Sequence, residues 1–145
     1  MSIEIFVLSD RRLDSIAEWQ QAIDKEGFDL RLDSSRPFEA QSGYLPANRG
    51  ELHAGFECDH WDPNDVFENC PDIDFGRAWS IALAFRFGGD FIAMWGTYAA
   101  AAAYSRATDG VLFDGESGDI MQPDKAVAFA RDLERDLPRL VGADT

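Results

Sequence analysis

The sequence predicts a single α+β domain over residues 1–145, in which a mainly antiparallel sheet carries two to three packed helices. Three observations lead to this prediction. Segments typical of strands and helices follow one another in the order β-α-β-β-β-α-β-α, with few long crossovers between strands. Residues 77–87 alternate large and small side chains, as a buried strand does. The chain is 46% hydrophobic and has 11 Phe, 4 Trp and 3 Tyr, so it can bury a substantial core.

The first two elements are a strand and a helix. Residues 3–8 (IEIFVL) form a short apolar run rich in β-branched and aromatic side chains, which predicts a buried strand. Ser15 and Glu18 have the spacing of a helix capping box, and an apolar stripe with a helical period follows them. Gly27 is suited to the left-handed conformation that ends many helices. We therefore expect a helix that begins near Ser15, or earlier near Asp10, and ends at Gly27.

The next segment is irregular. Residues 28–33 alternate apolar with charged side chains, which predicts a strand with one exposed face, whereas the Pro and Gly of residues 34–50 predict a connection. A further strand is expected from about Leu52 to Cys58. Asp62 followed by Pro63 is typical of the first residues of a short helix, within a segment otherwise expected to be an exposed loop.

The clearest strand is residues 77–87. Its bulky face is formed by Trp79, Ile81, Leu83, Phe85 and Phe87, and its other face by Ala78, Ser80, Ala82, Ala84 and Arg86. We expect the small face to let a helix approach closely, and the helix that follows is the candidate. That helix is predicted over residues 91–107 with Asp90 as its N-cap. Its aromatic side chains, Phe91, Trp95 and Tyr98, share a face with Ala102 and predict core packing.

The last elements are short. Asp109-Gly110 is expected to end the long helix, and residues 111–114 (VLFD) predict a strand followed by an acidic, glycine-rich turn. An amphipathic helix is expected from Pro123 to about Leu137, with Pro138 limiting it.

The charge of the chain is unevenly placed. Its net charge is −14, from 27 acids and 13 Lys and Arg. Residues 50–76 and residues 107–124 contain no Lys or Arg, and they hold eight and five acids, so the remaining 14 acids face all 13 bases. Halophilic proteins are acidic over the whole surface, and this local charge argues against that rival explanation. It favours a surface that attracts a cationic partner.

The sequence also bears on location. The N-terminal residues lack the basic region and cleavage site of a signal peptide, and no apolar run approaches the roughly 18 residues of a membrane span. We expect a cytoplasmic protein with no membrane association. Cys58 and Cys70 are expected to be free thiols in that compartment.

Signatures of catalysis are missing from the sequence. It contains no G-x-S-x-G elbow, Walker A loop, H-E-x-x-H or dinucleotide-binding glycine pattern. The acids of residues 71–77 (PDIDFGR) are arranged somewhat like those of a metal-dependent nuclease, but the lysine that this chemistry requires is missing. An acidic chain is also unsuited to holding phosphates. We expect neither enzymatic activity, nor a cofactor, nor nucleic-acid binding.

Three alternatives from other classes remain open. His53, Cys58, His60 and Cys70 are all residue types that ligate zinc, so the chain could be a small metal-binding enzyme or sensor, although the spacing matches no standard zinc motif. A carboxylate hydrolase could draw its acid and base from Glu57, Asp59, Asp62 and Asp114, with His60 beside Asp59. Regularly spaced surface carboxylates would instead make the chain an acidic mimic of nucleic acid.

The candidate binding site is the first acidic stretch, with Trp61 as an aromatic anchor, supported by the second. Aromatic residues supply most of the binding energy of protein interfaces, and charges at the rim supply association rate and selectivity. A core position beneath a loop is the other interpretation of Trp61. The candidate residues are Glu57, Asp59, Trp61, Asp62, Asp65, Glu68, Asp72, Asp74, Asp114, Glu116 and Asp119.

Several patterns give the chain a family resemblance. These are a GFE strand at residues 55–57, a long apolar strand ending in Gly88-Gly89-Asp90, an Ala-rich helix, and TDGVLFD at residues 108–114. The layout resembles that of small acidic bacterial immunity proteins of polymorphic toxin systems. The resemblance implies a protein that binds a cognate, basic toxin and blocks its active site, with no catalytic residues of its own.

Overall fold

The computed structural model describes the backbone of residues 3–140 and the side chains of residues 3–137. Within these residues the fold is α+β, as the sequence predicts, and the strand pairings are antiparallel. The main sheet has the strand order β3-β6-β7-β1-β8-β9. These strands are β1 (Ile3–Ser9), β3 (Tyr44–Leu45), β6 (Phe56–Trp61), β7 (Ile81–Phe87), β8 (Val111–Asp114) and β9 (Ile120–Met121). A small second sheet has the order β2-β4-β5, formed by β2 (Arg31–Leu32), β4 (Ala47–Arg49) and β5 (Leu52–His53).

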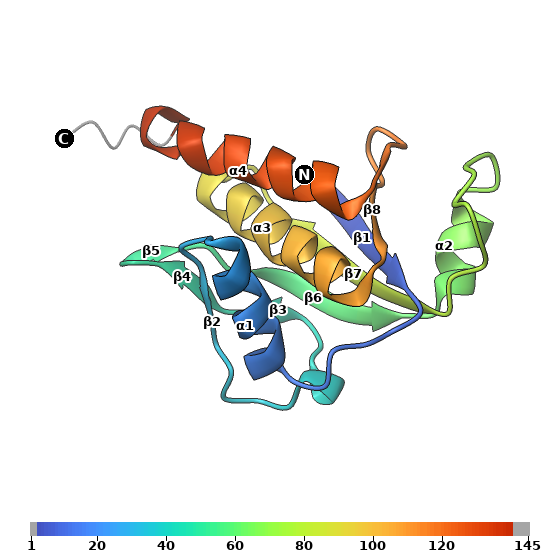
Figure 1. Cartoon of the computed structure of the whole chain (residues 1–145), viewed down its shortest axis with the longest axis horizontal. Coiled ribbons are helices and arrows are strands. Elements are labelled where there is room, and N and C mark those ends of the chain that lie inside the picture. Colours follow the sequence, from blue (N-terminus) through green and yellow to red (C-terminus); the bar gives the residue numbers. More distant parts are fainter. Residues whose placement is uncertain (1–2, 141–145) are drawn as a thin grey trace.

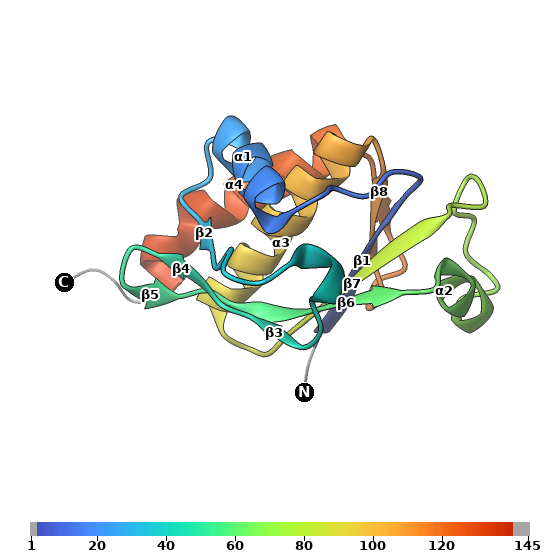
Figure 2. The same cartoon turned by 90° about the horizontal axis from the view of Figure 1, so that it is seen from below.

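Three long helices lie on one face of the main sheet, and a short one lies apart (Figures 1 and 2). The three are α1 (Ile16–Glu26), α3 (Phe91–Thr108) and α4 (Pro123–Leu140). The fourth helix, α2 (Pro63–Asn69), stands at the far end of the sheet, where β6 ends. A one-turn 3₁₀ helix, η1 (Phe38–Ala40), precedes β3. No helix in the described residues combines the length and apolarity needed to cross a bilayer.

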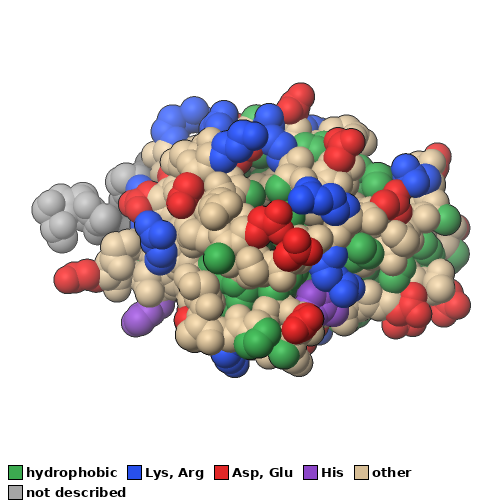
Figure 3. Space-filling model, turned by 60° about the horizontal axis from the view of Figure 1, so that its bottom comes forward, with side chains coloured by type: hydrophobic (Ala, Val, Ile, Leu, Met, Phe, Trp, Pro, Cys, Tyr) green, Lys and Arg blue, Asp and Glu red, His purple; other side chains and the backbone are tan. Residues whose placement is uncertain are grey.

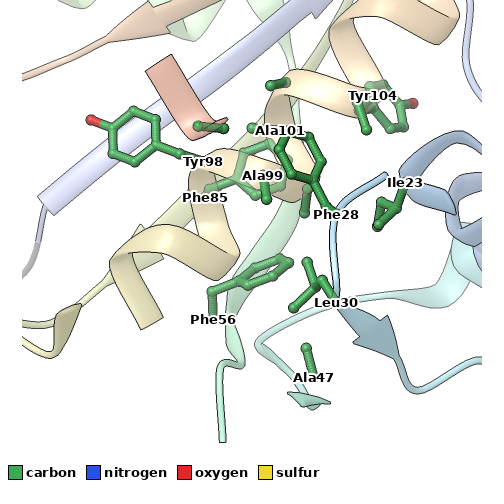
Figure 4. Close-up of a cluster of buried hydrophobic side chains, with 14 of the residues drawn as sticks. Ile23, Phe28, Leu30, Ala47, Phe56, Phe85, Tyr98, Ala99, Ala101 and Tyr104 are labelled. Carbon is green, nitrogen blue, oxygen red and sulfur yellow. The ribbon is translucent and has the colours of Figure 1, made fainter. Parts of the chain in front are cut away.

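The main core fills the space between the sheet and the three helices. The alanines at positions 99–103 of α3 are at most 1% exposed, so bulky side chains from the sheet and from α1 pack directly against this helix. Figure 4 shows Ala99 and Ala101 among Phe28, Leu30, Phe56 and Phe85. Trp19 of α1 is fully buried, and its indole N–H donates to the carbonyl of Ala100 at 2.9 Å.

Glycine lets α3 approach its neighbours closely. A Cβ atom on Gly96 would lie 2.4 Å from the carbonyl oxygen of Ala54, nearer than any side chain can come. At the other end of α3, a Cβ on Gly110 would lie 2.3 Å from the carbonyl oxygen of Leu8. The backbone near the start of α3 therefore lies against Ala54, and the turn after its end lies against Leu8.

A second, smaller core lies on the opposite face of the sheet. Its buried members are Phe6, Leu8, Val66, Phe75, Ala82, Ala84, Val111 and Phe113, and Trp61, Phe67, Cys70, Ile73, Trp79 and Ile120 pack at its edge. Alternate residues of a strand face opposite sides, so Phe56 and Cys58 of β6 belong to the main core while Trp61 belongs to the second. Helix α2 and the loop after it cover this second face.

The first helix is confirmed in detail. Ser15 is the N-cap of α1, where its hydroxyl accepts from the backbone N–H of Glu18 at 3.0 Å. The Glu18 carboxylate reaches back to the N–H of Asp14 at 2.7 Å, one residue before the position a standard capping box uses. Gly27 ends the helix with φ of 82°, as expected.

The prediction for residues 77–87 is wrong in two respects. Strand β7 begins at Ile81, because Arg77 and Ser80 are bound to Asp10, and the Trp79 indole donates to the carbonyl of Phe75. The small face of β7 also does not receive α3. Ala82 and Ala84 face the second core, whereas the bulky face packs on α3, whose own alanines permit the close approach.

Other boundaries also differ from the prediction. Residues 34–50, expected to be a connection, contain η1 and the short strands β3 and β4. The strand expected over residues 52–58 is divided between the two sheets, as β5 and β6. Helix α4 continues to Leu140, past Pro138. Helices α2 and α3 are confirmed, with Asp62 and Asp90 as their N-caps.

Candidate functional site

The part of the first acidic stretch that follows β6, residues 62–76, forms a cover over the second core. Helix α2 starts directly after Trp61, because Pro63 stands in its first turn and the Asp62 carboxylate accepts from the N–H of Asn64 at 3.0 Å. Val66 of α2 is buried in the second core, and Phe67 packs on Phe75 with ring centroids 5.1 Å apart. In this cover Val66, Phe67, Ile73 and Phe75 therefore point inward, and the acids are left at the surface.

Trp61 is half-buried at the edge of this cover. Its ring packs on Phe6 of β1, with centroids 5.2 Å apart. It also lines a surface groove of about 330 Å³ between the end of β6 and α2. The groove is lined by His60, Trp61, Asp62, Asp65, Glu68 and Asn69. Trp61 is therefore a core-edge residue that also forms the wall of a groove, and its role as a binding anchor stays a prediction.

The second acidic stretch lies beside the first. A Cβ on Gly118, in the turn between β8 and β9, would lie 3.4 Å from Cδ1 of Ile73, in the loop after α2. Phe75 from that loop packs on Phe113 of β8, with centroids 4.9 Å apart. Asp72 and Asp74 are therefore carried by a loop that touches the turn bearing Glu116 and Asp119. On the face drawn in Figure 3, acidic side chains gather at the end of the molecule where α2 lies.

Four of the predicted acids hold the backbone in place. Asp59 accepts from the hydroxyl of Ser42 and the N–H of Gly43, and Asp62 caps α2. Asp74 accepts from the N–H of Gly76 at 2.9 Å. Asp114 binds the turn that follows it, through the N–H of Glu116 at 2.9 Å, and also accepts from the hydroxyl of Tyr98 at 3.2 Å. These hydrogen bonds explain why Asp recurs at these positions without any partner molecule.

Glu57 and Asp59 lie on β6 outside the groove, although Asp59 lines a small depression together with Trp61 and Arg86. In the pairing of β6 with β7, Glu57 lies opposite Arg86 and Asp59 lies opposite Ala84. Arg86 pairs with Glu4 at 2.8 Å, and this hydrogen bond raises the pKa of the guanidinium, with Glu57 and Asp59 adding to the shift. The negative charge of Glu57 and Asp59 is thus partly balanced within the molecule.

The remaining acids are not balanced in this way. Within residues 3–137, none of the ten predicted site acids forms an ion pair, whereas arginines elsewhere pair with acids such as Glu4, Asp10, Glu18, Glu26 and Glu134. We call the surface formed by Trp61, Asp62, Asp65, Glu68, Asp72, Asp74, Glu116 and Asp119 the acidic face. It contains most of the predicted site and excludes Glu57, Asp59 and Asp114.

The four candidate zinc ligands do not come together. His53 is exposed on β5 of the small sheet, and Cys58 is buried in the main core. Cys70 packs on the second core, across the sheet from Cys58. His60 donates from Nε2 to the carbonyl of Phe38 at 2.9 Å when that nitrogen carries the proton. In the described part of the chain, no group of three or more His, Cys, Asp or Glu is arranged to hold a metal ion.

Two buried groups have shifted pKa values that follow from their packing. Burial raises the pKa of the Cys58 thiol well above its usual value, and neighbouring Asp59 adds to the effect, so this cysteine is a neutral thiol in the folded protein. Burial also raises the pKa of Tyr98, as does Asp114, to which its hydroxyl donates. Both shifts suppress ionisation, which is the opposite of what a nucleophile requires.

Sequence reasoning missed several residues that build the acidic face. Asn69 lines its groove, as does His60, which the sequence suggested only as a zinc ligand or a proton-transfer group, and Ile73 lies between its two loops. The alternation of apolar residues with acids in residues 66–75 was the available signal, since Val66, Phe67, Ile73 and Phe75 all face inward. No protein-family model, no curated protein and no solved structure matches this chain.

Proposed function

We propose that this protein is a non-enzymatic binding protein of the cytoplasm that neutralises a basic protein partner through its acidic face, as an immunity protein neutralises a toxin. The observation that carries the proposal is that the two stretches without Lys or Arg are neighbours in space. Ile73 of the first stretch lies next to Gly118 of the second. Within residues 3–137, no acid of the acidic face has a Lys, Arg or His partner within 4 Å, and we expect their summed field to attract cations and to speed their association.

The arrangement of the acidic face suits binding more than catalysis. Of the four carboxylates considered as acid and base, Asp59, Asp62 and Asp114 accept from backbone N–H groups, and Glu57 is exposed on β6. The remaining acids are exposed on α2 and on two turns, where solvent screens each one. Acids of this kind contribute through their summed field, and a half-buried tryptophan supplies apolar contact area beside them.

The proposal is tested with the product of an adjacent toxin gene, where the genome of the source organism has one. Co-expression should protect cells from that toxin, and the purified proteins should bind more weakly as salt rises. The double variant Asp65→Asn/Glu68→Gln should lower the affinity by about threefold to tenfold at low salt, because each exposed charge pair contributes about 0.2–1 kcal/mol.

A matched control carries the same loss of charge elsewhere. Glu39 lies in η1 and Glu51 in the turn between β4 and β5, both outside the acidic face. The variant Glu39→Gln/Glu51→Gln should keep the affinity of the unchanged protein. Equal losses for the two double variants, or an affinity that does not respond to salt, would contradict the proposal.

A further inference from the structure

Among the side chains of residues 3–137, two arginines each lie over a tryptophan ring and also pair with a carboxylate. The guanidinium carbon of Arg77 is 5.0 Å from the ring centroid of Trp79, and the same group pairs with Asp10. Arg49 lies 5.0 Å from the ring centroid of Trp95 and pairs with Glu134 at 2.9 Å. Guanidinium favours such sites because its flat face is attracted to the face of the ring. Its N–H groups, which lie in the guanidinium plane, remain free to bind carboxylate oxygens.

Trp61 has the aromatic and acidic parts of the same arrangement. Its ring lines the groove together with the carboxylates of Asp62, Asp65 and Glu68. Among the described side chains, however, the arginines that lie over a tryptophan ring are Arg49 and Arg77, and neither is at Trp61. The fourth tryptophan, Trp19, is enclosed in the main core by Phe38, Phe56, Phe85 and Tyr104.

Resting on the proposed function, we infer that the groove at Trp61 binds one arginine side chain of the partner. The guanidinium lies against the indole of Trp61 and pairs with Asp65 and Glu68. These two acids stand three residues apart on α2 and therefore on one side of it, and neither has an internal ion pair. The groove volume of about 330 Å³ falls at the lower end of the range of ligand pockets, which suits a single long side chain.

The geometry favours arginine over lysine. Arginine has a planar group with five N–H donors, which can contact the ring and both carboxylates together, whereas the ammonium of lysine is a strongly hydrated point charge. Asp62 adds charge beside them, and its Oδ1 already accepts from Asn64. The groove therefore provides shape selectivity within a surface that otherwise attracts any cation.

The inference is tested on the protein alone, with small probes. The indole N–H signal of Trp61 in a ¹⁵N-edited NMR spectrum is assigned from its loss in Trp61→Phe. It is then followed during titration with N-acetyl-arginine amide, N-acetyl-lysine amide and the uncharged N-acetyl-citrulline amide. We expect a saturable shift with arginine, binding at least about threefold weaker with lysine, and no response to citrulline.

Variants locate the site. Asp65→Asn/Glu68→Gln should weaken arginine binding severalfold, and Glu39→Gln/Glu51→Gln should leave it unchanged. Both pairs change exposed residues, so neither result depends on a loss of folding. A Trp61 signal that does not respond, that responds equally to arginine and lysine, or that is indifferent to Asp65→Asn/Glu68→Gln would overturn the inference.

The two proposals can fail separately. Selective arginine binding at Trp61 without toxin binding would retain the groove and remove the toxin as the partner. Salt-dependent toxin binding without an arginine response at Trp61 would retain the proposed function and assign the contact to other parts of the acidic face.

Discussion

The two faces of the main sheet are covered in different ways. On one face, three helices of 11 to 18 residues enclose a core in which α3 is buried around most of its circumference. On the other face, a seven-residue helix and two loops cover eight buried residues, and several of the surrounding side chains remain partly exposed. The unbalanced acids lie on the thinner cover.

The large core and the unpaired surface acids therefore lie on opposite faces of the main sheet. Acids crowded together repel one another, and they cost least where the chain is exposed and where hydrogen bonds to backbone N–H groups hold it in place. Asp62 and Asp74 supply such bonds in the cover itself. We expect the helix-covered face to contribute more to the stability of the fold, and the acids without backbone hydrogen bonds, such as Asp65 and Glu68, to be free to vary. Substitutions in the two regions should therefore have different effects.

The largest expected difference is between two tryptophans. Trp19 is completely buried, so Trp19→Ala should lower the free energy of unfolding by about 3–5 kcal/mol through cavity formation. Trp61 is half-buried, and Trp61→Ala should cost about 1–2 kcal/mol. Urea denaturation followed by circular dichroism measures both. Equal losses would mean that the two faces contribute equally to stability.

A second, smaller effect concerns the close contact of α3. Alanine normally stabilises a helix relative to glycine by about 1 kcal/mol. Gly96→Ala should nevertheless destabilise the protein by about 1–3 kcal/mol, because its Cβ would lie against the carbonyl of Ala54. The control is Gly89→Ala, where a Cβ meets no atom within 4 Å and little change in the thermal midpoint is expected. A stabilised Gly96→Ala variant would show that α3 can shift away from β5 and β6.

The smallest effect distinguishes two kinds of acid on the acidic face. Asp62→Ala removes the N-cap of α2 and should cost about 1 kcal/mol, whereas Asp62→Asn keeps the cap and should cost little. Glu68→Gln should change the free energy of unfolding by less than about 0.5 kcal/mol, because Glu68 is exposed and unpaired. Thermal unfolding of the three variants measures these differences. A large loss for Glu68→Gln would assign that residue a structural role.

The regular elements could be predicted because their signals are local. Ser15, Gly27, Asp62 and Asp90 act within a few residues of their own position, and each lies at the helix end that the sequence indicates. The edges of the strands could not be predicted in this way. Strand β7 starts late because Asp10, 70 residues away from Ser80 in the sequence, binds the segment before it.

The candidate site was predictable in composition but only partly in position. The absence of Lys and Arg identified the two stretches, and the contact of Ile73 with Gly118 brings them together. Charge alone did not show that Glu57 and Asp59 face Arg86 across the sheet, since that depends on the register of β6 with β7. Composition likewise does not reveal which arginines lie over tryptophan rings. Arg49 and Trp95 are distant in the sequence, and Arg77 reaches Trp79 only because of the local chain conformation.

The position of β1 in the sheet affects how the chain can assemble during its synthesis. Strand β1 contains residues 3–9, yet its neighbours are β7 and β8, and Ile3 stands opposite Phe87. At about 5–20 residues per second, the ribosome takes several seconds to add the strands that complete the centre of the sheet. Until then the apolar side chains of β1 have no strand partner. Folding is thus expected to be slow for a chain of this size, because contacts between distant residues must form first.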